Sequence, residues 1–277
     1  MDPAALAAAP RPAPTDAPTD APTAPAAPAP PDAPACDRVE RILGARYAAR
    51  RHRATARALG RHLEPESWLD VGTGGGGLPA AARDVLPYTA YDGIDTGAAV
   101  EDARAAGHIE EAHRGSLTGL APRLAGRYDA VSMVHQLERA ADPGAALAAA
   151  HAVLRPGGHL LIEAADPECR SAALLGPWWV AHPHRPRLLP LARLRRVLGE
   201  LGFTVVDVER RAAHLPYDLA GAVVLALHRF GPKAARSRGA APLVAAARAL
   251  DHALAPLLVR TGFANTYRVI ARREADA

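Results

Sequence analysis

The sequence has few of the residues that build small secreted, metal-rich or membrane-spanning proteins. Two cysteines in 277 residues, Cys36 and Cys169, exclude a disulfide scaffold and a cysteine-rich zinc module. No apolar run approaches the roughly 20 residues of a membrane-spanning helix. The chain also begins without the basic segment and apolar core of a secretory signal. We therefore expect a cytoplasmic protein in a reducing compartment.

The chain has few aromatic residues and only a small net charge. Aromatic residues make up 4% of the chain, and much of its 49% hydrophobic content is alanine, which contributes little burial energy. The formal net charge is only +4, from 33 Lys and Arg against 29 Asp and Glu, and the basic residues are scattered. We therefore expect no nucleic-acid partner.

The first 35 residues differ in composition from the rest. They hold 11 of the 26 prolines, a single leucine and no aromatic residue. Such a segment cannot bury enough apolar surface to offset the entropy lost on ordering. We predict a disordered Ala/Pro-rich tail over residues 1–35 and one folded domain over residues 36–277.

Strand and helix patterns alternate through most of the domain. Helical patterns cover residues 37–62, 78–86, 98–106, 144–154 and 189–201. Strand patterns cover residues 68–71, 88–94, 128–133, 158–163, 203–208 and 266–271. This alternation predicts an α/β fold, with a parallel sheet covered by helices on both faces. Gly202 is placed to end the last of these helices in a left-handed conformation.

About fifty residues separate the last two strands, far more than an ordinary connection. This insertion, residues 211–262, contains two apolar helical patterns, 219–230 and 242–259, with basic residues between them. A lid, a homodimer face and a contact with an anionic membrane surface all explain the pattern. The choice between them stays open at this point.

The most informative segment is residues 68–78, with the sequence WLDVGTGGGGL. A strand runs into a glycine-rich turn and then a helix, a pattern that is typical of sites for nucleotide-type ligands. Gly72, Gly74 and Gly77 satisfy the dinucleotide pattern G-x-G-x-x-G. Asp70 disfavours a phosphate beside it and favours a cationic ligand instead. S-adenosylmethionine has an ammonium group, a sulfonium group and no phosphate.

Asp95 ends the next predicted strand, 25 residues after Asp70. An acid at this place can accept hydrogen bonds from both hydroxyls of a ribose. Dinucleotide-binding folds share this feature, so it predicts an adenosine-type ligand without choosing between the two cofactors.

Several segments, in this order, are similar to the motifs of class I S-adenosylmethionine-dependent methyltransferases of the small-molecule type. They are residues 70–76, 93–95, 128–138, 154–160 and 194–203. The resemblance covers roughly residues 37–210 and 264–273. It implies a Rossmann-like, seven-stranded, mostly parallel sheet whose last strand is antiparallel, with the helical insertion before that strand.

The resemblance also implies S-adenosylmethionine as the cofactor and assigns residues to it. These are Asp70, Gly72, Thr73, Gly74, Gly76, Asp95, Ser116, Leu117 and Val134. Two positions depart from the family pattern. Arg139 stands where a histidine is common, and Ser116 where an aspartate often contacts the adenine.

Three histidines are the candidates for a catalytic base: His135, His182 and His184. His135 follows the fourth strand, and related methyltransferases often place a histidine beside the acceptor in the region of the other two. The spacing of His182 and His184 around a proline, without a third ligand nearby, indicates no metal site. Trp178 and Trp179 either line an acceptor pocket or pack in the core.

The resemblance therefore implies methyl transfer from S-adenosylmethionine to a small-molecule acceptor, with oxygen the commonest acceptor atom in the family. The Asn/Asp-Pro-Pro-aromatic tetrad of base amino-methylation is absent. Two alternatives stay open: an NAD(P)-dependent oxidoreductase that uses the same glycine-rich loop, and a non-catalytic cofactor-binding protein.

Overall fold

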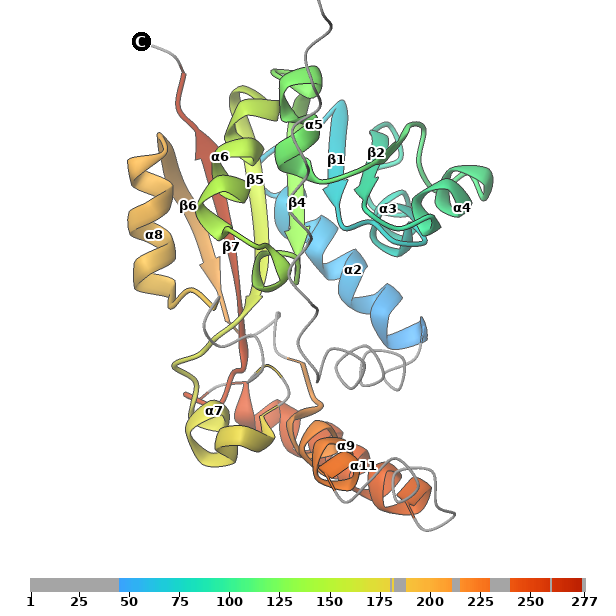
Figure 1. Cartoon of the computed structure of the whole chain (residues 1–277), viewed down its shortest axis with the longest axis vertical. Helices are drawn as coiled ribbons and strands as arrows, with labels where there is room; N and C mark the ends of the chain where they lie inside the picture. Colours follow the sequence, from blue (N-terminus) through green and yellow to red (C-terminus); the bar gives the residue numbers. More distant parts are fainter. Residues whose placement is uncertain are drawn as a thin grey trace, which may run out of the picture. The chain divides into compact units, whose positions relative to one another are not determined.

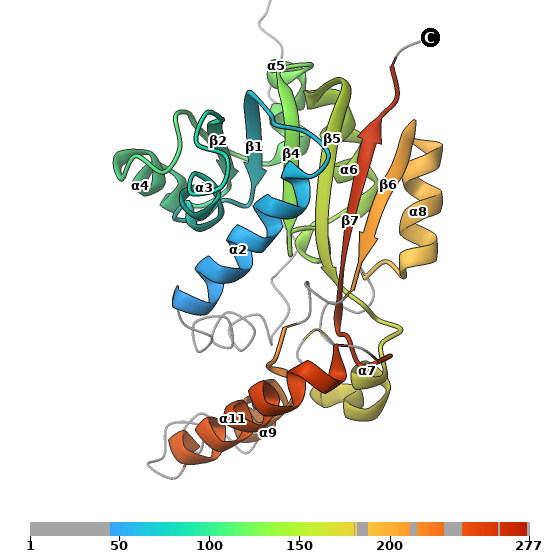
Figure 2. The ribbon, with the colours of Figure 1, turned by 180° about the vertical axis from the view of Figure 1, so that it is seen from behind.

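A seven-stranded sheet organises the chain (Figures 1 and 2). Its strands are β1 (Ser67–Val71), β2 (Ala90–Asp95), β3 (Ala112–Arg114), β4 (Tyr128–Val134), β5 (Leu154–Ala165), β6 (Phe203–Glu209) and β7 (Thr266–Arg273). Their order in the sheet is β3-β2-β1-β4-β5-β7-β6. β1 to β5 pair in parallel, and β7 runs antiparallel between β5 and β6. The predicted Rossmann-like sheet with an antiparallel last strand is confirmed.

The computed structural model describes residues 45–179, 181, 188–210, 215–229, 240–259 and 261–275. All of them belong to one unit that spans residues 31–277. The predicted tail and the first residues of the predicted 37–62 helix lie outside this description, so the expected tail stays a prediction.

Helices cover both faces of the sheet, as the alternating pattern predicted. The helices that the structure describes are α2 (Ala45–Gly60), α3 (Gly77–Ala82), α4 (Ala99–Ala105), α5 (Leu117–Leu124), α6 (Pro143–Val153), α7 (Arg170–Leu175), α8 (Leu191–Glu200), α9 (Asp218–Arg229) and α11 (Ala240–Leu258), of which α7, α9 and α11 lie beyond one end of the sheet. Two short 3₁₀ helices are η1 (Leu137–Arg139) and η2 (Gly176–Trp178). Figure 1 shows α5, α6 and α8 in front of the sheet, and Figure 2 shows α2 and α3 on the other face.

Strand periodicity explains this division into two faces. Leu69 and Val71 pack with α5, α6 and α8 in one buried cluster. Trp68, their neighbour on β1, packs with α2, α3 and α4 in another. Successive side chains of a strand point to opposite faces, so a sheet that is buried on both faces needs apolar residues at adjacent positions.

Local signals set several element boundaries. Asp142 accepts a hydrogen bond from the Ala145 N–H and caps α6, which begins at Pro143. Gly202 has φ 79°, which confirms the predicted left-handed end of α8. The helix predicted over residues 78–86 ends earlier, at Ala82. Pro87 follows it closely, and a residue before proline is disfavoured in the helical region.

A buried ion network fixes α2 against the sheet. The Arg268 Nε of β7 donates to Glu163 Oε1 of β5 at 2.8 Å, and Thr55 of α2 donates to the same oxygen at 2.6 Å. A second Arg268 nitrogen bonds Thr55 Oγ1 at 3.2 Å. The arginine lowers the pKa of Glu163 although burial opposes this. The network therefore positions the inner face of α2 over the sheet.

The insertion between β6 and β7 contains α9 and α11, as predicted. The Asp251 carboxylate of α11 accepts hydrogen bonds from the Leu219 and Ala220 N–H groups at the start of α9. Just before α9, Leu215 exchanges two hydrogen bonds with the side chain of Asn265, next to β7. Among the helices that the structure describes, none has the length and apolarity to cross a membrane.

Candidate functional site

A cavity of about 870 Å³ lies where the strand order reverses, at the carboxyl ends of β1, β2 and β4. This is where open α/β sheets bind ligands. Ligand cavities typically range from about 300 to 1,000 Å³, so this one is near the large end of that range. Its walls come from the loops after β1, β2, β3 and β4, from α2, and from the residues before α9: these include Gly72–Gly74, Asp95, Gly115–Thr118, Val134–Gln136, Arg51, His52, Leu215 and Tyr217.

The glycine-rich loop lines this cavity, and its glycines have different roles. Gly72 has φ 74°, and a Cβ there would lie 1.9 Å from Gln136 Cδ. Gly74 has φ 50°, but a Cβ there would meet nothing within 4 Å. The space beside Gly74 is therefore a cradle that a ligand can enter. Gly76 is buried against His108 and is not part of the cavity wall.

Asp70 puts a buried carboxyl group on the same wall. It is only 4% exposed, and Ser132 Oγ donates to its Oδ1 at 2.6 Å. Ser132 is held in turn by the Trp68 Nε1–H at 2.9 Å. Burial raises the pKa of Asp70 to about 6, so near pH 7 the group is mostly a desolvated anion. Such a group attracts a cationic ligand and disfavours a phosphate.

Asp95 lies at the end of β2, half-buried on the cavity wall. Its Oδ2 accepts a hydrogen bond from the Gly74 N–H at 3.0 Å, and its Oδ1 from the Gly97 N–H at 2.7 Å. Each carboxylate oxygen can accept a further bond, which suits a pair of vicinal hydroxyls. Thr73 is held nearby: a Cβ on Gly93 of β2 would lie 2.5 Å from its Cγ2.

The remaining predicted cofactor residues line the cavity as well. Ser116 caps α5 by accepting a hydrogen bond from the Gly119 N–H at 3.2 Å. Leu117 is 5% exposed and Val134 is half-buried at the end of β4. The structure thus brings all the predicted cofactor residues except Gly76 to one cavity.

His135 is in an unusual conformation on this wall. It has φ 53°, the one positive φ among the non-glycine residues that the structure describes. Its Nδ1 lies 3.0 Å from Glu138 Oε1, an oxygen that also accepts the Ala165 N–H at 2.9 Å. Its Nε2 is buried without a hydrogen-bond partner among the described residues. Backbone strain at a residue of this type is found at functional sites.

Glu138 completes this arrangement from η1. Burial alone would raise its pKa, but the hydrogen bonds from His135 and from the Ala165 N–H outweigh burial and lower it. Glu138 is therefore ionised and accepts the Nδ1–H of His135. That bond fixes the ring orientation, and in a neutral ring with this tautomer the lone pair is on Nε2.

Of the other predicted acceptor residues, Trp178 and Trp179 are not among the described residues that line the cavity. His182 and His184 lie outside the described residues. Trp179 is 1% exposed and packs with Cys169 and Leu188 in a small separate core. The Arg229 guanidinium lies over the indole ring of Trp178, with its Cζ 5.4 Å from the ring centroid. Of the two sequence-based interpretations of Trp179, the structure supports core packing.

Sequence reasoning missed the α2 wall. Arg51 and His52 line the cavity, although neither was among the residues predicted for the site. Burial and the adjacent Arg51 lower the pKa of His52 to about 4, so its imidazole is neutral. The signal was available, because Ala48, Arg51, His52 and Thr55 have the spacing of one helix face.

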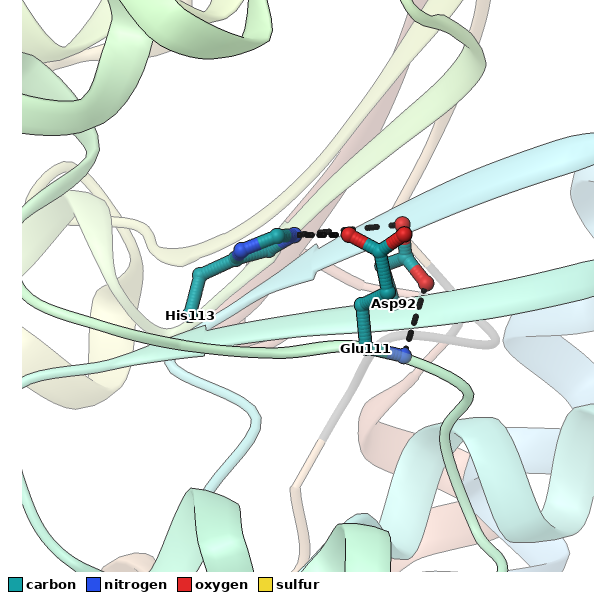
Figure 3. A group of neighbouring side chains, drawn as sticks. All are labelled: Asp92, Glu111 and His113. Atoms are coloured by element: carbon teal, nitrogen blue, oxygen red, sulfur yellow. Dashed lines mark hydrogen bonds and ion pairs between the residues drawn. The ribbon is translucent and has the colours of Figure 1, made fainter.

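A second group of ionisable side chains lies away from the cavity, between β2 and β3. Figure 3 shows Asp92, Glu111 and His113 pointing toward one another, with His113 Nε2 3.5 Å from the Glu111 carboxylate. Tyr128 donates to Asp92 at 2.8 Å, and Arg127 pairs with Glu111 at 3.3 Å. Each of the two acids thus has partners among these side chains, and we interpret the cluster as a polar network that joins β2, β3 and β4.

Comparison with known proteins agrees with this geometry. A family described as "methyltransferase domain" matches residues 41–208, more than half of the chain. A ubiquinone biosynthesis O-methyltransferase from Azotobacter vinelandii is 30% identical over 115 residues, which are 39% of this chain and 49% of that protein. The chain therefore spans about half the length of this curated relative.

Solved structures share the fold at low sequence identity. The plantazolicin methyltransferase BamL, solved with a substrate analogue and S-adenosylhomocysteine (SAH), is 14% identical with a TM-score of 0.56, over 88% of this chain and 91% of that one. An O-methyltransferase family protein from Burkholderia thailandensis is also 14% identical, with a TM-score of 0.51, over 84% of this chain and 59% of that one.

Proposed function

Because the chain belongs to the class I S-adenosylmethionine-dependent methyltransferases, we propose that it transfers a methyl group to a hydroxyl oxygen of a small-molecule acceptor. The cavity supports this proposal because its wall carries two acids beside the glycine-rich loop and a cation, Arg51, on α2. Asp70 and Asp95 line the end formed by the glycine-rich loop, whereas Arg51 and the two histidines His52 and His135 line other parts of the wall. Two ligands of different chemistry fit such a cavity.

The acidic end fits S-adenosylmethionine. The open cradle beside Gly74 admits its amino-acid portion, and the buried carboxylate of Asp70 favours a positive charge there. Asp95 would accept the ribose hydroxyls, and Ser116 and Leu117 would contact the adenine. When bound, the cofactor supplies an electrophilic methyl group on a positively charged sulfur that is a good leaving group.

The protein's main contribution is then to position the acceptor. Holding two reactants in the right geometry supplies about 7–11 kcal/mol of the barrier reduction in favourable cases. The neutral imidazole of His52 and the guanidinium of Arg51 lie on the wall beyond the glycine-rich loop. They would bind an acceptor that carries a hydroxyl, or that becomes anionic when its hydroxyl loses a proton.

The observation that carries the oxygen assignment is the pair formed by His135 and Glu138. An alcohol or phenol must lose its proton as it is methylated, and a general base for this step contributes roughly 10²–10⁴-fold. Glu138 holds the Nδ1–H of His135, so Nε2 is the nitrogen that takes the proton. Glu138 thus acts as a positioning residue, through His135.

A two-part experiment tests this function. Calorimetry with SAH and with NAD⁺ identifies the cofactor, and binding of NAD⁺ alone would contradict the proposal. Methyl transfer is then measured on pairs of small phenols and the matching anilines. We expect methylation of the phenols, and transfer to the anilines alone would refute the oxygen assignment.

The role of His135 has its own test. His135→Gln should lower kcat by roughly 10²–10⁴-fold and leave the SAH affinity unchanged. Glu138→Gln should lower kcat less and change its pH profile, because the ring loses its ionised partner. His252→Gln, an exposed histidine on α11, is the matched control and should keep full activity. A pH profile unchanged in both site variants would show that neither residue acts in proton transfer.

A further inference from the structure

The outer face of α11 is apolar along its whole length. Leu243, Leu250 and Leu257 are 52%, 49% and 69% exposed, and they recur at every seventh position. Residues seven apart on a helix drift by only about 20° around the axis, so the three leucines form one stripe. The other exposed residues of the helix are alanines and prolines, together with His252: Ala241, Pro242, Ala245, Ala246, Ala249, Ala253 and Pro256.

The charged residues of α11 are turned away from this face. Asp251 is only 4% exposed because it caps α9, and Arg248 is half-buried. A solvated helix face normally carries charged side chains, and a contiguous apolar face marks an interaction surface. The fold itself does not need this stripe, since α11 packs on α9 through its other side.

The charges at the surface of the α9–α11 hairpin are positive. Its two acids, Asp218 and Asp251, are 7% and 4% exposed, whereas Arg229 at the end of α9 is exposed. In the sequence, the ten residues that join the two helices, 230–239, add three cations and no acid. An apolar stripe beside cations, without an exposed acid, suits an anionic lipid surface.

A second copy of the chain suits this face less well. Two hairpins packed stripe to stripe in parallel would bring their cationic ends together. That arrangement opposes like charges, whereas a membrane with anionic headgroups neutralises them.

We propose that the hairpin of α9 and α11 docks on an anionic membrane surface, with the leucine stripe at the boundary between headgroups and acyl chains. Leu215 and Tyr217, which line the cavity, directly precede α9. Docking would therefore bring the cavity near the lipid surface, where a lipophilic acceptor can reach it. The docking itself does not rest on the proposed methyl transfer.

Co-sedimentation of the full chain with lipid vesicles tests the proposal. We expect binding to vesicles of phosphatidylglycerol mixed with phosphatidylcholine, weakening as salt is raised, and little binding to phosphatidylcholine alone. The triple variant Leu243→Gln/Leu250→Gln/Leu257→Gln should bind the anionic vesicles at least about tenfold more weakly than the unaltered protein. Tyr88→Gln removes a side chain that is 97% exposed elsewhere and should bind like the unaltered protein.

Folding is checked separately, by the thermal transition of each variant and by its affinity for SAH. Because the leucines are exposed, both should stay unchanged in the triple variant. Absence of binding to the anionic vesicles, or equal binding by the triple variant, would overturn the proposal. If light scattering shows a dimer that becomes a monomer in the triple variant, and the protein does not bind vesicles, the face is assigned to a second copy instead.

Discussion

The ribose assignment of Asp95 leads to a quantitative prediction. The change Asp95→Ala removes a carboxylate that ends β2 on the cavity wall. A hydrogen bond to a charged group contributes about 1.5–3 kcal/mol. Loss of a single such bond to a hydroxyl therefore weakens binding by roughly 10- to 150-fold, since about 1.4 kcal/mol corresponds to tenfold. We expect calorimetry to show at least this tenfold loss for SAH.

The same substitution also disturbs the protein, and the assay has to separate the two effects. Asp95 accepts hydrogen bonds from the Gly74 and Gly97 N–H groups, so its loss loosens the glycine-rich loop. A looser loop weakens every ligand equally. Loss of the ribose contact weakens only a ligand that has the hydroxyls.

A ligand that lacks both ribose hydroxyls completes a thermodynamic cycle. The unaltered protein should bind the 2′,3′-dideoxy analogue of SAH at least tenfold more weakly than SAH itself. The Asp95→Ala variant should distinguish the two ligands by much less. Asp84→Ala, which removes an exposed carboxylate paired with Arg53, controls for the change in net charge. If the variant distinguishes the ligands as well as the unaltered protein does, the ribose contact does not exist.

Further predictions concern the cradle, the buried acid and the ion network. Gly74→Ala and Gly107→Ala each place a Cβ in open space at a residue with positive φ. Each substitution should therefore lower the unfolding free energy by about 1–2 kcal/mol. Only Gly74→Ala should also weaken SAH binding in calorimetry. Burial raises the pKa of Asp70 from 3.8 to about 6, so the folded state holds this proton more tightly than the unfolded state. The stability of the ligand-free protein should therefore fall by up to about 3 kcal/mol as pH rises from about 4 to about 6, and urea unfolding of Asp70→Asn should lack this component. Arg268→Met leaves Glu163 buried without its cation and should lower the unfolding free energy in urea by about 3–5 kcal/mol, whereas a loss below about 1 kcal/mol would contradict the role of the network.

The parts of the fold that follow from local sequence were predictable. Adjacent apolar residues such as Trp68 and Leu69 indicate a strand buried on both faces, and the structure places them in two different cores. The glycine-rich turn and the acid Asp95 depend on spacings within about thirty residues. The left-handed Gly202 depends only on its neighbours. Short-range periodicity and backbone conformation are enough for these features.

The rest of the site depends on contacts between distant residues. Thr55 and Arg268 are 213 positions apart, yet their hydrogen bond holds the α2 wall in place. No local pattern predicts this contact, and the sequence analysis did not assign Arg51 and His52 to the site. The positive φ of His135 could not be predicted from the sequence either. Histidine adopts a positive φ more often than most residues do, but still in only a minority of cases.

The segment after β4 joins the two halves of the cavity. Gln136 packs against Gly72 of the glycine-rich loop, where a Cβ would be only 1.9 Å from it. The preceding residue, His135, is bonded to Glu138, whose carboxylate is fixed to β5 through the Ala165 N–H. The glycine-rich loop therefore packs against the same two-residue segment that holds the ring of His135, the proposed base. The backbone with positive φ at His135 lies within that segment.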